Sequence, residues 1–532
     1  MSVGPDRVCA AVARTRHKMM LAELKAAGER GSKFVEVRID FLAKAVDFKR
    51  LAPAKGEGCS WLGTIRRPAD GGRWPGTEQE RQMVLRQAIV SGVIDWIDLE
   101  TDVADSLRRF GSVKRVVSYH NMTETPPDLD DIYERMLKQD ADVLKVAVLP
   151  RTPADLARIV AIQKRAPKPT VCFGMGELGF PTRFTALKFG APWVYATFNK
   201  ERQLAPGMPA VADFRTTYPV KKVDADTRFY AVVGDPIGHS LSPVLHNHTL
   251  LRNKVNGFYV PIRVPEGQLK ATVAALDAVP FDGYSVTIPH KEEAATAGEA
   301  DAVVLQVGAA NTLVRQPAGG FRVLNTDHPA ALESLHAHLV EKAEASKTAV
   351  KELAQSHALE LGAGGVSRAV AFALHRAGTT VTIAGRTAER AERLAAEIGC
   401  KFCDWAARHN VDPCDIVVNG TPVGMHPNVD ESPLHVSFLK PGLVVFDTVY
   451  NPEQTMLVRD ARARGCGTVT GVELFVRQAA KQFELFTGLV PSLADMRELV
   501  RKAMSPLTKA MDEEAAKSGV ADDEVGGDDG ED

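Results

Sequence analysis

The segment ALELGAGGVSRAVAFALHRAG, residues 358–378, joins a short apolar run to a glycine-rich turn and a long helix-forming stretch. This order is typical of the first unit of a dinucleotide-binding sheet. The alternation of apolar strand and helical stretch continues through VTIAGRT at 381–387, DIVVNGT at 415–421 and LVVFDTV at 443–449. The sequence therefore predicts a Rossmann-type domain, which we place at residues 331–471.

The glycine loop indicates what this domain binds. Gly362, Gly364 and Gly365 let the backbone approach a pyrophosphate, and the start of the following helix supplies N–H donors. After the next strand, Arg386 and Arg390 stand where an NAD site would have an acidic residue. Arginines bind a 2′-phosphate through paired hydrogen bonds, so we expect NADP rather than NAD. Taken singly, the loop could be a plain tight turn and the arginines ordinary residues of a helix start.

Short apolar runs also recur through residues 8–198, separated by helical stretches such as 78–90 and 154–165. Each run is rich in β-branched or aromatic residues, as strands buried on both faces are. Eight runs that alternate with helices predict a (β/α)8 TIM barrel within a first domain at residues 1–216. The runs are 8–13, 34–39, 61–65, 93–99, 116–119, 143–148, 170–173 and 193–198.

In such a barrel, polar residues at the C-terminal strand ends should share one mouth. Lys145 is unusual because it lies among valine and leucine in ADVLKVAV, where burial would lower its pKa and leave a neutral amine that attacks ketones. His120 ends the preceding strand, and its near-neutral titration suits proton transfer. Considered alone, Lys145 could simply reach solvent. The residues expected at the mouth are Glu36, Arg38, Arg66, Glu100, His120 and Lys145.

Residues 228–330 alternate strands and helices again and predict a second α/β domain, so the whole chain is expected to belong to the α/β class. The polar residues 217–227 are expected to be a linker. The acidic, glycine-rich tail at 505–532 is expected to be disordered, and no function can be assigned to it. Each candidate site residue of the middle region is alone a common loop residue: Ser240, Ser242, Thr287, Lys291, Asn311 and Asp327.

The composition excludes several classes of function. A formal net charge of −2 argues against nucleic-acid binding. No apolar run is long enough to span a membrane, and the N-terminus lacks the pattern of a signal peptide. Because the chain begins almost at its first strand, we expect no plastid transit segment. Seven cysteines without metal-binding spacing indicate reduced thiols in a cytoplasm and no metal site. The sequence does not indicate the oligomeric state.

Four segments of the first domain, FVEVRID, SYHNM, ADVLKVAV and FGMGELGFPTR, resemble type I 3-dehydroquinate dehydratase in order and spacing over residues 6–215. The resemblance implies that Lys145 forms an imine with the C3 ketone of 3-dehydroquinate. It implies that His120, oriented by Glu36, removes the C2 proton and later protonates the leaving hydroxyl. The residues that would bind the substrate hydroxyls and carboxylate are Glu36, Arg38, Arg66 and Arg183.

This sequence departs from that family in the stretch QLAPGMP. Leu204 and Met208 stand where the family usually has a serine and a glutamine. Both are apolar and cannot hydrogen-bond the substrate, so binding or lid closure should weaken while the chemistry persists. Asp70 stands where the family often has a glutamate.

The second half resembles shikimate dehydrogenase over residues 228–500, through GDPIGHSLSP, SVTIPHK, GAANTL, NTD, GAGGVSR, GRT and FVRQAAKQFELFTG. The resemblance implies that Lys291 and Asp327 are the catalytic pair of a hydride transfer, and that residues 472–503 complete the substrate domain at 228–330. Substrate would be bound by Ser240, Ser242, Thr287, Asn311, Tyr450 and Gln478. NADP would be bound by Gly362, Ala363, Gly364, Gly365, Val366, Gly385, Arg386, Thr387, Arg390, Thr448 and Gly471.

Our main hypothesis is therefore a bifunctional enzyme whose first domain makes 3-dehydroshikimate and whose second domain reduces it with NADPH. One alternative is a quinate dehydrogenase in the second half, although Ser240 and Ser242 resemble the arrangement that selects shikimate. The other is a catalytically weakened barrel that binds a ligand, an alternative suggested by Leu204 and Met208. The expected partners are small-molecule substrates, with neither nucleic acid nor membrane.

Overall fold

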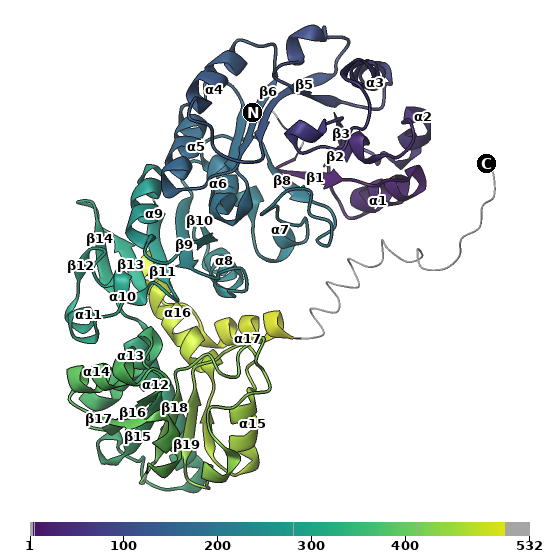
Figure 1. Ribbon diagram of the computed structural model, residues 1–532. Coiled ribbons are helices and arrows are strands. Elements are labelled where there is room, and N and C mark those ends of the chain that lie inside the picture. Colours follow the sequence, from purple (N-terminus) through teal and green to yellow (C-terminus); the bar gives the residue numbers. More distant parts are fainter. Residues whose placement is uncertain (1–3, 5, 280, 412, 506–532) are drawn as a thin grey trace.

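The computed structural model describes residues 4, 6–279, 281–411 and 413–505, so the predicted tail lies outside the described residues except for Ser505. The described chain forms a barrel, a middle α/β domain and a second parallel-sheet domain in that order (Figure 1). None of the helices in this described part has the length and apolar content needed to cross a lipid bilayer.

The first domain is a parallel barrel, as predicted. Its strands follow one another around the barrel in the order β7-β6-β5-β4-β3-β2-β1-β8, and no ladder joins β7 to β8 within the described residues, so the barrel is nearly closed. The strands are β1 (Val8–Val12), β2 (Phe34–Arg38), β3 (Ser60–Thr64), β4 (Trp96–Glu100), β5 (Lys114–Asn121), β6 (Val143–Val148), β7 (Thr170–Gly174) and β8 (Val194–Thr197). The helices are α1 (His17–Glu29), α2 (Phe48–Leu51), α3 (Glu78–Val90), α4 (Leu129–Leu137), α5 (Pro153–Arg165), α6 (Gly176–Lys188) and α7 (Asp213–Thr216).

The middle domain is built on a mixed sheet with the strand order β10-β9-β11-β13-β14-β12. Two C-terminal helices return to it, and Gln482 on one of them donates a hydrogen bond to the carbonyl of Asn311 (2.9 Å). The strands are β9 (Arg228–Gly234), β10 (Gly257–Arg263), β11 (Phe281–Val286), β12 (Glu299–Ala300), β13 (Thr312–Arg315) and β14 (Phe321–Leu324). The helices are α8 (Ser242–Arg252), α9 (Leu269–Ala275), α10 (Lys291–Ala294), α11 (Ala302–Val307), α16 (Gly471–Thr487) and α17 (Leu493–Met504).

The third domain has the predicted Rossmann-type sheet. Its first strand lies in the middle, in the order β17-β16-β15-β18-β19-β20, which places a topological switch point between β15 and β18. The strands are β15 (His357–Leu361), β16 (Thr380–Gly385), β17 (Lys401–Asp404), β18 (Ile416–Asn419), β19 (Val444–Asp447) and β20 (Gly467–Val469). The helices are α12 (Asp327–Ser346), α13 (Gly365–Arg376), α14 (Ala388–Ile398) and α15 (Met456–Ala463).

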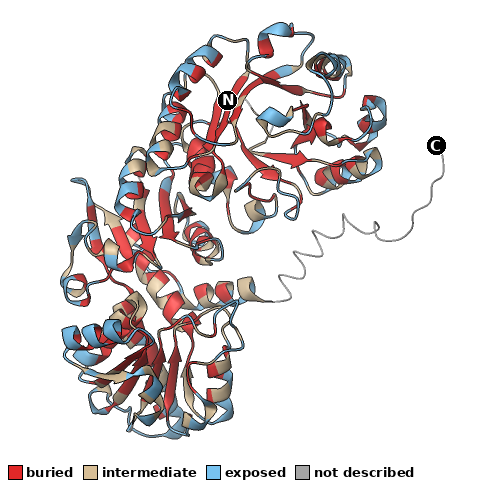
Figure 2. Ribbon diagram, in the orientation of Figure 1, coloured by how far each residue is buried: buried red, intermediate tan, exposed pale blue. Residues whose placement is uncertain are grey.

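The barrel and the middle domain share one apolar core, where α5 and α6 pack against β10 and α9 (Figures 1 and 2). The ring of Phe184 on α6 lies 5.2 Å from that of Phe258 on β10. The segment expected to be a polar linker belongs to this core, because its apolar side chains Tyr218, Val220 and Val223 are buried there. The linker thus fixes the two domains against each other, which its average polarity does not indicate.

Phe184 allows the shared core to be tested, because its side chain is fully buried. We expect Phe184→Ala to lower the free energy of unfolding by about 3–5 kcal/mol, through lost burial and the cavity left behind. The matched control is Phe110→Ala, whose ring is 62% exposed and whose loss should change stability by less than about 0.5 kcal/mol. Urea unfolding gives both values, and similar effects of the two variants would contradict the shared core.

Two candidate active sites

The C-terminal ends of the barrel strands form one pocket that holds a lysine, a histidine and three arginines. The pocket includes every expected mouth residue except Glu100. Its polar lining is Glu36, Arg38, Arg66, Asp70, His120, Lys145 and Arg183, and its apolar lining includes Met122, Phe173, Met175, Tyr195, Leu204, Ala205 and Met208.

The amine of Lys145 is buried inside this barrel, on β6, whose six residues are all buried. Its Nζ lies 3.3 Å from Asp98 Oδ2, 3.7 Å from Glu36 Oε1 and 4.1 Å from the ring centroid of Tyr195. Burial and the neighbouring Arg66 lower the pKa of Lys145, while Glu36 and Asp98 oppose that shift. The site therefore favours the neutral amine more than water does, as a nucleophile requires.

His120 lies in the same pocket as a base without a fixed partner. Neither of its ring nitrogens has a hydrogen-bond partner among the described residues. Burial, together with Arg66 and Lys145, holds the pKa of His120 well below its usual value, so the imidazole is neutral. The expected contact that would orient it is not formed, because Glu36 instead accepts a hydrogen bond from Thr64 Oγ1 (2.8 Å) and lies 3.9 Å from Arg66.

Arg183, on α6, is a buried cation without an ion pair among the described residues. Its guanidinium stacks over Phe173 at 4.3 Å, its Nη2 makes only a long contact with the carbonyl of Pro206 (3.4 Å), and its Nε has no partner. Burial lowers the pKa of Arg183 to about 9. Burying a cation costs free energy unless an anion pairs with it, so Arg183 is suited to bind a carboxylate ligand. By contrast, Arg38 is already paired with Asp40 through two hydrogen bonds (3.0 and 2.8 Å).

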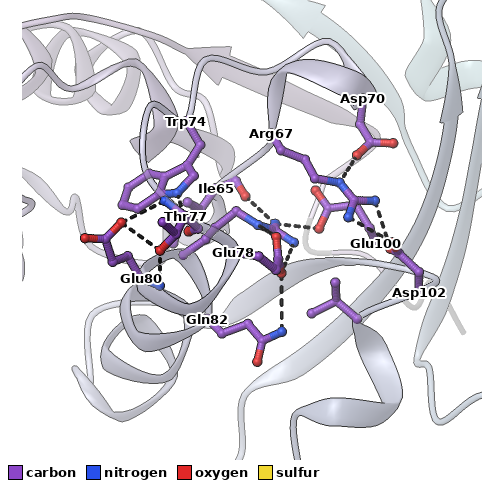
Figure 3. Close-up of polar contacts among 12 residues, drawn as sticks. Ile65, Arg67, Asp70, Trp74, Thr77, Glu78, Glu80, Gln82, Glu100 and Asp102 are labelled. Atoms are coloured by element: carbon purple, nitrogen blue, oxygen red, sulfur yellow. Dashed lines mark hydrogen bonds and ion pairs between the residues drawn. The ribbon is translucent and has the colours of Figure 1, made fainter.

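β4 carries two acidic residues, and the one beside the pocket lysine is not the one predicted from the sequence. Glu100 accepts a hydrogen bond from Arg81 Nη1 (2.7 Å) and is not among the residues that line the pocket. Figure 3 shows it near the ion pairs of Arg67. Asp98, which the sequence analysis did not select, is the buried carboxylate beside Lys145 and Arg66. An acidic residue at the centre of an apolar strand was the available signal.

The segment that covers the pocket is apolar. Leu204 and Met208 contribute to the pocket wall, and Met208 is buried. The backbone of this segment is held by a hydrogen bond from Gly176 N to the carbonyl of Pro206 (2.9 Å). Asp70 lines the pocket but accepts a hydrogen bond from Arg67 (2.5 Å), which also contacts Asp102 (Figure 3). This side of the pocket can exclude water but offers few hydrogen bonds.

The second site centres on an ion pair between the first residues of α10 and α12. Lys291 Nζ donates to Asp327 Oδ2 at 2.6 Å, and both side chains are buried. Asn311 lies beside them and donates to Thr326 Oγ1 (2.9 Å) and to Gln478 Oε1 (3.4 Å). The other predicted residues are Thr287, half-buried after β11; Ser240 and Ser242 at the start of α8; and Tyr450, stacked on Phe475 at 4.5 Å.

The glycine loop lies against this ion pair. Gly362 has φ +121°, which favours glycine, and a Cβ on Gly365 would come within 2.8 Å of Lys291 Cβ. Gly364 is the N-cap of α13 without a side-chain cap, and a Cβ there would meet nothing within 4 Å. The loop therefore leaves room above a helix N-terminus, which fits a pyrophosphate. Ala363 and Val366 are half-buried. Gly385 is the last residue of β16, Thr387 is the N-cap of α14, Thr448 follows β19, and Gly471 is the first residue of α16.

The two arginines expected to bind a 2′-phosphate differ in their contacts. Arg386 is exposed and forms no ion pair with any described residue. Arg390, on α14, forms an ion pair with Glu292 of α10 and so links the third domain to the middle domain. Arg390 was expected to be open to the cofactor, so a ligand phosphate has to share or replace Glu292.

Beneath the glycine loop lies Glu360, a buried carboxyl that the sequence analysis did not single out. It is fully buried on β15, and neither of its oxygens has a hydrogen-bond partner among the described residues. Burial holds the pKa of Glu360 well above its usual value. The nearby hydroxyl of Ser367 donates to the carbonyl of Gly420 (3.2 Å) and links α13 to the end of β18. A neutral carboxylic acid thus lies under the loop.

Glu360 should make stability depend on pH. Because the pKa of Glu360 is raised in the folded protein, its contribution to the free energy of unfolding is complete below the pKa of about 4.3 that it has in the unfolded chain. This contribution declines as the pH rises toward the pKa in the folded protein. Glu360→Gln removes this pH dependence. Above pH ~4.3, the free energy of unfolding of the variant should therefore rise relative to that of the unsubstituted protein by up to about 1.4 kcal/mol per pH unit. Urea unfolding at several pH values measures the gain. The exposed Glu352→Gln is the control, and parallel pH curves for Glu360→Gln would refute this assignment.

Comparison with known families follows this division of the chain. Residues 8–225 match the family model of type I 3-dehydroquinase. Residues 232–313 match the shikimate dehydrogenase substrate binding domain, 344–429 match shikimate / quinate 5-dehydrogenase, and 471–501 match the shikimate 5′-dehydrogenase C-terminal domain. The fold and both sites therefore define a fusion of a dehydroquinase barrel with a shikimate dehydrogenase.

Individual relatives identify the family. A chloroplastic bifunctional 3-dehydroquinate dehydratase/shikimate dehydrogenase of Arabidopsis thaliana is 36% identical over 503 residues, which are 91% of this chain and 82% of that protein. An NADP+-dependent shikimate dehydrogenase of Moorella thermoacetica is 37% identical over 53% of this chain and 96% of its own length. The Thermus thermophilus shikimate 5-dehydrogenase in complex with NADP(H) and shikimate is 33% identical with a TM-score of 0.46, over 52% of this chain and 100% of its own. The chain belongs to the bifunctional 3-dehydroquinate dehydratase/shikimate dehydrogenase family.

Proposed function

We propose that this protein dehydrates 3-dehydroquinate to 3-dehydroshikimate in the barrel and reduces 3-dehydroshikimate to shikimate with NADPH in the second half. The observation that carries the proposal is the pair of buried lysines. Lys145 shares a pocket with the neutral His120 and with Arg183, which forms no ion pair within the described residues. Lys291 lies beside an aspartate and a glycine loop.

In the barrel, the amine of Lys145 adds to the C3 ketone and expels water, which forms an iminium. His120 then removes the C2 proton, and the electron pair of that C–H bond moves to the iminium nitrogen. The C1 hydroxyl leaves with a proton from His120, and hydrolysis of the imine returns the amine and the product. The neutral state of His120 supports its role as the base. The buried Arg183, which forms no ion pair with any described residue, supports binding of the ring carboxylate. The other polar groups proposed to hold substrate are Glu36, Arg38 and Arg66.

In the second site, Lys291 gives a proton to the ketone oxygen of the substrate, and Asp327 holds the lysine and a substrate hydroxyl. When bound, NADPH supplies the hydride. The open space over Gly364 and the exposed Arg386 fit its phosphates. The residues proposed to bind substrate are Ser240, Ser242, Thr287, Asn311, Tyr450 and Gln478, and those proposed to bind the cofactor are 362–366, Gly385, Arg386, Thr387, Arg390, Thr448 and Gly471.

A cytoplasmic location is part of the proposal. The seven cysteines all lie within the described residues and form no disulfide. Cys9 and Cys172 are buried in the barrel, where burial raises the pKa of each thiol. Unpaired buried thiols of this kind suit a reducing compartment.

The two activities should separate by mutation. We expect Lys145→Ala to abolish dehydration and to leave reduction of 3-dehydroshikimate unchanged, while Lys291→Ala does the reverse. Borohydride reduction in the presence of 3-dehydroquinate should add the substrate mass at Lys145 by mass spectrometry, and Lys145→Ala should gain none. Each activity serves as the folding control for the other variant. The absence of an adduct together with the absence of dehydration would refute the barrel activity and leave the reductase standing.

The arginines of the third domain should decide between NADP and NAD. Arg386→Ala removes a charged hydrogen bond to the 2′-phosphate, so the Kd for NADP should rise about 10-fold or more while the Kd for NAD stays unchanged. Glu292→Gln should lower the Kd for NADP a few-fold, because it frees Arg390. Calorimetric titration measures both constants, and Arg393→Ala, at an exposed position on α14, is the control. A parallel change for NAD and NADP would contradict this assignment.

A further inference from the structure

Asp98 lies at the centre of the charged groups beneath the barrel pocket. It is buried on β4, and its Oδ1 accepts a hydrogen bond from Ser118 Oγ (2.6 Å). Its Oδ2 lies 2.8 Å from Arg66 Nη2 and 3.3 Å from Lys145 Nζ. One carboxylate oxygen therefore lies between two cations.

Asp98 lies outside the wall of the pocket. It is absent from the residues that line the pocket, whereas Glu36, Arg66 and Lys145 all line it. Burial alone would raise the pKa of Asp98, but Arg66 and Lys145 hold it well below its usual range, so the group is a carboxylate. A buried anion is costly unless its partners compensate it, and here both partners belong to the proposed site.

The proposed reaction changes the charge on the nitrogen of Lys145. The amine must be neutral when it attacks the ketone, and the nitrogen becomes a cation again as the iminium. A fixed anion at 3.3 Å stabilises the cationic states relative to the neutral one. It also fixes the position of the nitrogen from which the attack on the ketone would start.

We propose that Asp98 is a positioning residue of the barrel site. Its carboxylate fixes the side chains of Lys145 and Arg66 relative to each other and stabilises the iminium as its counter-ion. This inference rests on the proposed dehydratase function. It goes beyond that function by assigning the counter-ion to a residue outside the pocket wall. Ser118 then fixes the carboxylate from the far side.

The charge effect can be separated from the other groups around Lys145. Asp98→Asn keeps the shape and an acceptor for Ser118 but removes the charge, so the amine should lose its proton at lower pH. The other titratable and charged groups around Lys145 are unchanged in this variant, so the shift in the pKa of Lys145 can be assigned to Asp98. These groups are Cys9 on β1, Glu36 on β2, Arg66 after β3, His120 on β5 and Tyr195 on β8.

The test compares Asp98→Asn with Ser118→Ala, which keeps the charge and removes one hydrogen bond. For Asp98→Asn we expect the acid limb of the kcat/KM profile for dehydration to move about one unit or more to lower pH. At the pH optimum, kcat and the borohydride-trapped fraction of Lys145 should fall about tenfold or more. A factor of ten corresponds to losing one pKa unit of stabilisation of the iminium by Asp98. Ser118→Ala should reduce the rate less and leave the acid limb in place. Reduction of 3-dehydroshikimate by the same chains is the folding control.

Equal effects of the two variants, or an unmoved acid limb in Asp98→Asn, would overturn the proposal. If Asp98→Asn yields no folded protein, the double variant Asp98→Asn/Arg66→Gln is used instead and compared with Arg66→Gln. The double variant removes both members of the ion pair and leaves no unpaired charge from it. The same downward shift of the acid limb is expected, and its absence refutes the inference. Failure of the unsubstituted protein to trap substrate at Lys145 would instead refute the dehydratase function itself.

Discussion

The strands of the barrel and of the third domain's sheet all pair in parallel, and this constraint decides where both sites lie. Parallel strands bring all their C-terminal ends to one edge, so residues far apart in sequence meet there. Lys145 and His120 meet on neighbouring strands in this way, and Arg66 and Arg183 join them from the following loop and helix. In the third domain the same rule places the glycine loop at the end of β15, against Lys291.

The shared core extends this constraint across the first two domains. Arg263, at the end of β10, donates to Glu177 at the start of α6 (2.6 Å) and to Asp235 after β9 (2.9 Å). Glu177 lies two positions after the pocket residue Met175, and Asp235 opens the loop that leads to Ser240. The C-terminal edges of the barrel and of the middle sheet are therefore joined on one side of the interface. The apolar contact of Phe184 with Phe258 makes this arrangement firm, since an exposed ion pair alone contributes little.

The sequence was sufficient to predict what depends on local pattern. Strand periodicity predicted the barrel, and the glycine loop predicted the Rossmann-type sheet, because burial on both faces and a backbone turn both leave local signals. It was not sufficient to predict which charged group pairs with which. Glu100 and Asp98 have the same chemistry and lie two positions apart on β4, yet one pairs with Arg81 and the other with Arg66 and Lys145. The partner comes from other elements in each case, as does the Glu292 that pairs with Arg390. The buried apolar residues of the linker were missed for the same reason, because their partners lie in both domains.

The two lysines show how burial serves different chemistry according to the anions around it. Lys145 has two carboxylates at 3.3 and 3.7 Å, and Asp98, the nearer one, is also bound by Arg66. Each of these carboxylates also lies near Arg66, so neither pairs with the amine of Lys145 alone. Such shared pairing suits a nitrogen that must change from a cation to a neutral nucleophile and back. Lys291 has a single carboxylate at 2.6 Å, and no described arginine or lysine other than Lys291 pairs with Asp327. A short bond to one partner fixes the direction in which a proton is delivered and leaves little freedom for the nitrogen to attack carbon. The arrangement of anions, more than burial alone, thus distinguishes the proposed nucleophile from the proposed proton donor in this chain.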